Sequence, residues 1–254
     1  MNIAPDLSIC VATTSKRPEV LERFLSSVSQ TDDHLSMEII VVDRYSVEKS
    51  SLEVIRKFSM VNLVDLDAGC SLASAFGEAM SISNGRYVSL WSDDIIVGID
   101  SLIRLVEFLD ENPDAGVVAP GMKNGIGESL PIARVLPTLG SLMGSDPVPG
   151  LPMLEGNDEV RSEAEWLLGP PMIINRCLID EIGGISGQFP QYWHLEYCLR
   201  AARAGWHMLF CHDAQVKGTF ESFRHKNHIS RLSLLQEKIA IAFKNELLVL
   251  ISKG

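Results

Sequence analysis

The sequence predicts a single α/β domain in which helices flank a mostly parallel, Rossmann-like central sheet, with a helical extension at the C-terminus. Short apolar runs typical of buried strands alternate with segments of helical period in the first 120 residues. That alternation indicates right-handed crossovers between parallel strands. The length of 254 residues suits one such domain, and 46% hydrophobic with 22% charged residues are ordinary globular proportions.

The first 120 residues supply the alternating strands and helices. One of the helices starts at Pro18, a residue suited to the first turn of a helix. The expected strands cover residues 7–12, 37–42, 61–66, 87–92 and 115–119. The expected helices cover residues 18–28, 52–58, 71–83 and 100–109.

A long stretch of weak periodicity follows. Residues 120–171 hold eight of the twelve prolines, and loops of this length inside a compact domain are usually functional. We expect a mobile loop over residues 121–160, with a passive surface excursion as the alternative. Order returns with a strand, two helices and a late strand, expected at residues 166–175, 176–182, 192–204 and 207–211.

A final helix is expected over residues 230–251, where apolar side chains form a broad stripe. The stripe favours packing on the core or against a second copy of the chain, as a homodimer. Peripheral attachment to a membrane is the alternative, disfavoured because Lys and Arg are sparse on the polar face.

Charge and cysteine usage exclude some classes of function. A formal net charge of −11 argues against a nucleic-acid partner, which would need a basic face. The five cysteines are odd in number and scattered, which is typical of reduced, buried thiols. The sequence shows neither a secretion signal nor a run of about twenty apolar residues. We therefore expect a cytoplasmic protein, with membrane association as the alternative.

Two adjacent carboxylates, Asp93 and Asp94, follow the expected strand 87–92, and Asp43 follows another strand. The carboxyl ends of strands in an open α/β sheet form the ligand-binding edge, where two acids can hold a divalent cation. Helix capping is the alternative role for the pair. An anionic ligand would need a local cation in this acidic protein, which favours a metal at the pair. The glycine-rich phosphate-binding patterns GxGxxG and GxxxxGK[ST] are absent.

Four stretches occur in a recognisable order: LSICVATTSKRPEVLERFLSSV, MEIIVVD, SNGRYVSLWSDD, and WLLGPPMIINRCLIDEIGG with YWHLEYCLRAARAGW. Together they resemble the nucleotide-sugar glycosyltransferases of family 2, which have the GT-A fold. The resemblance implies a nucleotide-sugar-binding half over residues 1–120, an acceptor-side loop over 121–160, and an acceptor-side half with the C-terminal helix over 161–254.

The resemblance also implies roles for single residues. Thr14 and Asp43 match positions at the nucleotide base, with Thr13 as their neighbour. Asp94 matches the ligand of Mn²⁺ or Mg²⁺ at the diphosphate, and Asp93 points toward the ribose or donor sugar. Such a cation stabilises the charge that develops on the diphosphate leaving group. The implied partners are a nucleotide-diphosphate sugar donor and a glycan or lipid-linked acceptor.

Three departures from the family pattern stand out. Relatives often carry an arginine before an asparagine where this chain has Phe76 and Gly77. They commonly carry Glu-Asp, with the aspartate as general base, where this chain has Trp193 and His194. Lys217 replaces a histidine that often follows the last strand. The acid and the arginine that come next in the pattern are matched by Glu196 and Arg200.

His194 and Glu196 are therefore the candidate catalytic bases. A neutral imidazole can take the acceptor proton, in which case the rate should rise with pH near roughly 6 to 7. The alternative is that His194 is a helix-surface residue and that Glu196 forms an ion pair with Arg200. His225 and His228 could close over the metal, although such a cluster is more often a solvated loop.

The sequence thus predicts a metal-dependent, inverting glycosyltransferase. A sugar nucleotidyltransferase is a second candidate, but the chain lacks the GxGTR-like loop that such enzymes use on phosphates. A third is a non-catalytic relative that binds nucleotide-sugar, which the missing Glu-Asp pair and Phe76 favour.

Overall fold

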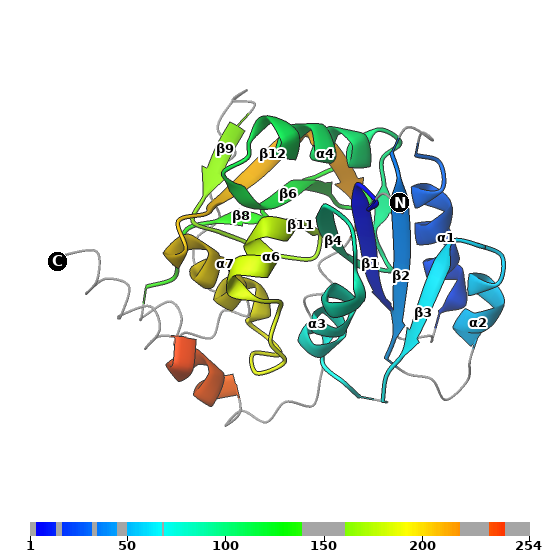
Figure 1. Cartoon of the computed structure of the whole chain (residues 1–254), viewed down its shortest axis with the longest axis horizontal. Helices are drawn as coiled ribbons and strands as arrows, with labels where there is room; N and C mark the ends of the chain where they lie inside the picture. The colour runs from blue at the N-terminus through cyan, green and yellow to red at the C-terminus, as the bar shows by residue number, and fades with distance from the viewer. Residues whose placement is uncertain are drawn as a thin grey trace.

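A computed structural model describes residues 4–13, 17–31, 35–44, 50–67, 69–138, 161–218 and 234–241. These residues form one mixed, mostly parallel sheet with helices packed against it, as the sequence predicts (Figure 1). Strands β1 (Leu7–Thr13), β2 (Met37–Asp43) and β3 (Val61–Asp65) lie toward the right of Figure 1 with helices α1 (Pro18–Val28) and α2 (Ser50–Ile55), and helices α6 (Arg176–Ile182) and α7 (Trp193–Arg203) lie further to the left.

The long strands of the sheet run in the order β3-β2-β1-β4-β11-β6-β12. Every pairing among them is parallel except those of β11, which runs antiparallel to both β4 and β6. Because β11 comes late in the chain and lies between β4 and β6, both halves of the sequence share one sheet. The bounds are β1 Leu7–Thr13, β2 Met37–Asp43, β3 Val61–Asp65, β4 Tyr87–Ser92, β6 Ala115–Lys123, β11 Met172–Asn175 and β12 His207–Lys217.

Short strands complete the sheet at its margins. Strand β5 (Ile96–Val97) pairs with β12, as does β9 (Arg161–Ala164), and β7 (Ser129–Leu130) pairs with β6. A separate two-stranded sheet joins β8 (Ala133–Arg134) to β10 (Trp166–Leu167).

The helices pack against this sheet through their apolar faces. α1 contacts α2 and β5, α3 contacts β1 and β2, α4 contacts β6 and β12, and α7 contacts β6, β10 and β12. Their bounds are α1 Pro18–Val28, α2 Ser50–Ile55, α3 Leu72–Ile82, α4 Ser101–Glu111, α6 Arg176–Ile182 and α7 Trp193–Arg203. No helix in the described ranges is long and apolar enough to cross a membrane.

Two expectations about element bounds and one about the cysteines need correction. Strands β6 and β12 run further than the sequence suggested, to Lys123 and Lys217, because they pair with each other along this extension. The single strand expected over residues 166–175 is two strands, β10 and β11, since the intervening Gly-Pro-Pro includes two residues with no N–H to donate to a ladder. Cys177 is exposed and Cys70 is half-buried, whereas the other three cysteines are buried as expected; all five are free.

The expected mobile loop and final helix are described only in part. Residues 121–123 belong to β6, and β7 and β8 follow, so short strands occupy part of the first third of the expected loop. Residues 139–160 lie outside the described residues. Residues 234–241 are helical, and the remainder of the expected helix over 230–251 lies outside the described residues.

Helix α3 lies very close to the loop that joins α6 to α7. A Cβ atom added at Gly77 would lie 2.5 Å from the carbonyl oxygen of Ile185, and one added at Gly187 would collide with the Ser74 hydroxyl. The glycine at position 77 is therefore explained by packing. Phe76, beside it, is fully buried.

We expect Gly77→Ala to lower the midpoint of thermal unfolding, although alanine is the better helix former by roughly 1 kcal/mol. Forcing a methyl group against a backbone carbonyl costs about 1–3 kcal/mol, so the net loss after the gain in helix propensity is up to about 2 kcal/mol, or up to roughly 8 °C in a chain of this size. Ser81→Ala, on the exposed part of the same helix, is the control and should change the midpoint little. A raised midpoint for Gly77→Ala would contradict the close approach of this loop.

Candidate functional site

The carboxyl ends of three parallel strands meet at one edge of the sheet. Thr13 at the end of β1 is in register with Asp43 at the end of β2, and Ala12 is in register with Ser92, the last residue of β4. Asp93 and Asp94 follow Ser92 directly. The fold thus brings together Thr13, Asp43 and the carboxylate pair, whereas Thr14 lies outside the described residues.

A hydrogen bond joins two of these strand ends. The Thr13 hydroxyl donates to Oδ2 of Asp93 over 2.7 Å, across 80 positions of sequence. Burial raises the pKa of Asp93 to about 6; the charge of neighbouring Asp94 adds to the rise, and Thr13 and Arg17 oppose it. The Asp93 carboxylate is therefore held in a place where its negative charge is costly, and a bound cation would relieve that cost.

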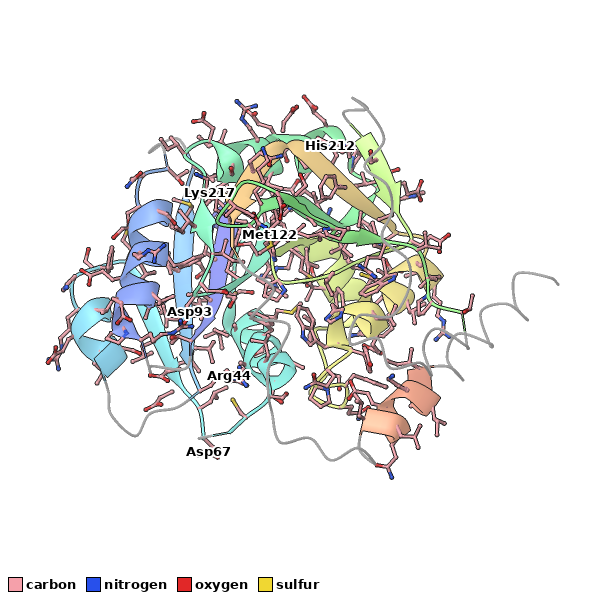
Figure 2. All side chains as sticks on the ribbon, turned by 180° about the vertical axis from the view of Figure 1, so that it is seen from behind. Arg44, Asp67, Asp93, Met122, His212 and Lys217 are labelled. Carbon is pink, nitrogen blue, oxygen red and sulfur yellow. The ribbon has the colours of Figure 1, made fainter. Side chains whose placement is uncertain are left out.

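The adjoining wall of the site is fixed by backbone and guanidinium contacts. The Leu66 N–H donates to the Asp43 carbonyl over 3.0 Å, and the Arg44 N–H donates to the Thr13 carbonyl over 3.1 Å. The buried Arg44 guanidinium donates twice to the Cys70 carbonyl, at 3.0 and 2.7 Å. Figure 2 shows Arg44, Asp67 and Asp93 toward one end of the molecule, away from His212.

Two cations at this edge were missed by the sequence reasoning. Arg17 and Arg23 line a pocket of about 190 Å³ together with Asp93, Asp94 and the apolar side chains Val20, Ile95 and Ile96. The pattern KRP, which begins three residues after the end of β1, was the available indication for Arg17. These side chains provide positive charge beside the carboxylates of an acidic protein.

The carboxylate pair fits a cation that is held jointly with a phosphate ligand. Within the described ranges, no group of three or more His, Cys, Asp or Glu side chains is arranged to hold a metal ion. Mg²⁺ commonly takes only one or two carboxylates and completes its shell with phosphate oxygens and water. Two adjacent acids at an open strand end, one of them with a raised pKa, match that donor set. His225 and His228, the other candidate ligands, lie outside the described residues.

On the acceptor side, His194 is a buried residue of the first turn of α7. Its side chain is 6% exposed, its ring stacks on Trp166 with centroids 5.4 Å apart, and Nδ1 has no hydrogen-bond partner among the described residues. Burial, with a further contribution from Arg134, lowers the pKa of His194 to about 3. The surface-residue interpretation is therefore wrong, and a rate increase due to this imidazole would lie below pH 5 rather than near 6 to 7.

Glu196, two residues further along α7, is also buried and forms the ion pair that the sequence offered as an alternative. Both of its carboxylate oxygens accept from Nε of Arg200 at 3.1 Å. Arg200 also donates to the carbonyls of Ile182 at 2.7 Å and Gly184 at 2.9 Å. The pair thus ties α7 to the end of α6.

The two main departures from the family pattern contact each other. Phe76 in α3 packs edge-on against Trp193 at the start of α7, with ring centroids 5.2 Å apart. Both side chains are buried. The resemblance implies an arginine at position 76 and an acidic residue at position 193. In this chain, both positions instead hold aromatic side chains that contact each other. Lys217, the third departure, is exposed at the end of β12 (Figure 2).

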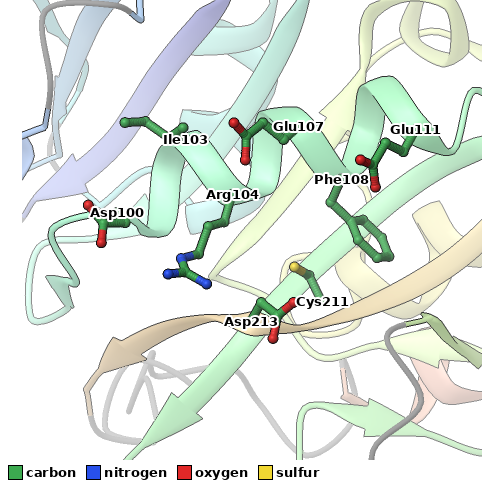
Figure 3. Close-up of a pocket in the computed structure, with 8 residues that line it drawn as sticks. All are labelled: Asp100, Ile103, Arg104, Glu107, Phe108, Glu111, Cys211 and Asp213. Atoms are coloured by element: carbon green, nitrogen blue, oxygen red, sulfur yellow. The ribbon is translucent and has the colours of Figure 1, made fainter.

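A larger pocket, of about 460 Å³, lies between α4 and β12 and shares no residue with the carboxylate edge. Figure 3 shows Arg104 among four carboxylates, with Phe108 and Cys211 beside them. Cys211 is buried, and burial raises the pKa of its thiol, so it is not a reactive nucleophile.

Comparisons with known proteins show which family the sequence matches. The sequence model of the family described as "Glycosyl transferase family 2" matches residues 8–136. An N-acetylglucosaminyl-diphospho-decaprenol L-rhamnosyltransferase of Mycobacterium tuberculosis is 22% identical over 243 residues, which cover 87% of this chain and 76% of that protein.

Solved structures share the fold at low sequence identity. TarS 1–349 of S. aureus is 16% identical with a TM-score of 0.61, covering 87% of this chain and 63% of that one. The mannosyltransferase PcManGT from Pyrobaculum calidifontis, solved with GDP-Man and Mn²⁺, is 16% identical with a TM-score of 0.63, covering 96% and 65%. This chain spans less than two thirds of both.

The raised pKa of Asp93 predicts a pH-dependent gain in stability for Asp93→Asn. Above pH 6 the folded protein carries a desolvated carboxylate, whereas at pH 4.5 that group is already protonated, so the penalty is smaller. The asparagine keeps an oxygen to accept from Thr13. We expect the unfolding midpoint to rise by roughly 3 °C at pH 8 and by less at pH 4.5.

Asp110→Asn is the matched control. Burial alone would raise the pKa of Asp110, but hydrogen bonds from Arg86 and Tyr87 lower it overall, so this substitution should destabilise the protein at pH 8. A loss of stability in Asp93→Asn at pH 8, equal to that in the control, would contradict the cost assigned to the Asp93 charge.

Proposed function

The chain belongs to glycosyl transferase family 2, and we propose that this nucleotide-sugar glycosyltransferase transfers its sugar to an acceptor hydroxyl with inversion and with Mg²⁺ or Mn²⁺ bound. One observation supports this proposal most strongly. The carboxyl ends of β1, β2 and β4 lie at one edge of the sheet and place Thr13, Asp43 and the Asp93–Asp94 pair there.

The donor lies, in this proposal, across the strand ends. Asp43 and Thr13, with Thr14 beside them, contact the nucleotide base, and Asp93 contacts the ribose or the donor sugar. Asp94 holds the cation, and Arg17 adds positive charge beside the diphosphate. PcManGT was solved with GDP-Man and Mn²⁺, and TarS 1–349 was also solved with UDP, which supports a nucleoside diphosphate group as part of the ligand of this shared fold.

The bound cation supplies Lewis-acid stabilisation of the leaving diphosphate. The protein's own part is to place carboxylate oxygens at the open strand end and to hold Asp93 through the Thr13 hydroxyl. The apolar side chains of Val20, Ile95 and Ile96 limit water on one side of the pocket. In this setting, charge interactions at the diphosphate are stronger than in bulk solvent.

For the acceptor proton we propose His194, with Glu196 as the alternative. His194 is neutral at physiological pH because burial lowers its pKa, so its unpartnered ring nitrogen is available to accept. Glu196 has both carboxylate oxygens engaged as hydrogen-bond acceptors by Nε of Arg200. The weak basicity of His194 counts against it, since proton transfer is favoured by a base whose pKa is near the working pH.

A lipid-linked glycan is the proposed acceptor class. The mycobacterial relative is named for a diphospho-decaprenol substrate, which supports this choice. Residues 234–241 present two apolar side chains to solvent, Leu235 and Ile239, each about 40% exposed. We propose a cytoplasmic protein in which these exposed side chains contact a second copy of the chain, with peripheral membrane contact as the alternative.

A non-catalytic nucleotide-sugar binder is the second candidate. The contact between Phe76 and Trp193, and the burial of His194 behind it, favour this candidate, because they remove charged groups from positions where relatives carry them. Transfer assays distinguish the two functions, since a binder would take up donor without releasing nucleoside diphosphate.

We expect Asp94→Ala to abolish the gain in nucleoside diphosphate affinity that Mn²⁺ provides, with the fold intact, because Asp94 is a partly exposed residue after a strand. Isothermal titration with uridine and guanosine diphosphates, with and without Mn²⁺, measures this. Asp43→Ala is the matched comparison and should weaken binding of the better nucleotide in both conditions. Unchanged Mn²⁺-dependent affinity in Asp94→Ala would overturn the metal assignment.

If His194 accepts the proton, His194→Ala should reduce transfer by about a hundredfold or more and leave donor binding unchanged. At saturating donor and Mn²⁺, the wild-type rate should be flat from pH 5 to 8, because the pKa of about 3 lies below this range. Normal transfer by His194→Ala together with loss of transfer in Glu196→Gln would assign the base to Glu196 instead.

A further inference from the structure

The C-terminal helical segment reaches the start of the acceptor-side helix through one buried carboxylate. Glu237 lies in residues 234–241, and its side chain is 6% exposed. Its Oε1 accepts from the backbone N–H of Gln191 at 2.9 Å and from that of Tyr192 at 2.7 Å. In Figure 1 this segment is the short orange-red helix below α7.

These two N–H groups lie where a helix needs an acceptor. Tyr192 is the N-cap residue of α7, and its N–H is among the first donors that the helix leaves without an intrahelical acceptor. Tyrosine is not one of the short polar residues that usually cap a helix. In a capping box, a carboxylate three residues into the helix accepts from the N-cap N–H. Here that acceptor comes from a residue 45 positions away.

The charge of Glu237 is also favourably placed. A carboxylate near the N-terminus of a helix interacts with the positive end of the helix dipole, and its hydrogen bonds to N–H groups are charge-assisted. Burial raises the pKa of Glu237, and the two N–H groups counter that rise. A buried carboxylate with these two donors is a fixed structural contact rather than a surface charge.

The loop between α6 and α7 is consequently held at both ends. Arg200 donates to the carbonyls of Ile182 and Gly184 at its beginning, and Glu237 accepts from Gln191 and Tyr192 at its end. Between these points the loop lies against α3, where Gly77 leaves room for its backbone.

The first turn of α7 begins immediately after Tyr192, where the Glu237 carboxylate holds the end of the loop. Trp193 packs on Phe76 of α3, and His194 stacks on Trp166. A change in the direction of the chain at Tyr192 would therefore shift both aromatic contacts and the imidazole that we propose as the base.

We propose that Glu237 is a positioning residue, which caps α7 from the C-terminal segment and thereby fixes the acceptor-side turn that carries Trp193 and His194. This proposal rests on the proposed function for its link to the acceptor. The capping itself is independent of any activity.

Hydrogen exchange of the full chain, followed by mass spectrometry, tests the cap. We expect Glu237→Ala to increase the exchange rate of amides in residues 191–196 by at least about tenfold, since two hydrogen bonds to a charged group are lost. Glu237→Gln keeps a side-chain carbonyl that can accept both N–H groups and should restore most of the protection. Gln236→Ala, at an exposed neighbouring position, should match the wild type.

Steady-state kinetics then test positioning. Glu237→Ala should raise KM for the acceptor or lower kcat by about tenfold, with KM for the donor unchanged, and Glu237→Gln should recover at least half of the loss. Wild-type exchange in Glu237→Ala would overturn the cap, and faster exchange with unaltered acceptor kinetics would overturn the positioning role. Should Glu237→Ala not fold, failure of Glu237→Gln to retain wild-type protection would overturn the proposal. A wild-type chain without transfer activity counts against the proposed function alone, because the exchange result still decides the cap.

Discussion

The shared register of β1, β2 and β4 is the constraint on which the rest of the site depends. Because these strands are parallel and in register, their carboxyl ends place Thr13 beside Asp43 and bring Ser92 level with Ala12. The bond from the Thr13 hydroxyl to Asp93 then joins the first strand to the carboxylate pair. A shift of one strand by one residue would turn these side chains to the other face of the sheet.

The site concentrates negative charge in a protein that is already acidic. Burial makes the negative charge of Asp93 unfavourable and raises its pKa, and the neighbouring charge of Asp94 raises that pKa further. Arg17 and Arg23 compensate for part of that charge beside the same pocket. Sites that bind charged ligands commonly hold such unfavourable charges, since the bound ligand or its cation neutralises them. A nucleoside diphosphate bound with a divalent cation would complement this edge, because the cation would neutralise the carboxylates and the diphosphate would face the arginines.

Much of the fold could be predicted from the sequence, because local patterns of apolar residues identify its strands and helices. Apolar runs such as residues 37–42 and the glycine-led strand before Asp93 identify buried strands from their own residues, and the GT-A resemblance orders them. The burial of His194, the contact of Phe76 with Trp193 and the Glu237 cap depend on residues far apart in sequence. No local pattern of charge or period indicates them. Arg17 was visible in the KRP pattern, but only the folded edge places it beside the carboxylates.

The central claim is that Asp94 binds a divalent cation together with a nucleoside diphosphate at the carboxyl ends of β1, β2 and β4. Anomalous diffraction at the manganese absorption edge, from crystals grown with Mn²⁺ and either uridine or guanosine diphosphate, measures the cation's position directly. The account predicts one peak at about 2 Å from an Asp94 carboxylate oxygen, a typical metal–oxygen distance, and in contact with the diphosphate. Nucleotide bound at this edge without a peak beside Asp94, or a peak only in the pocket between α4 and β12, would contradict it.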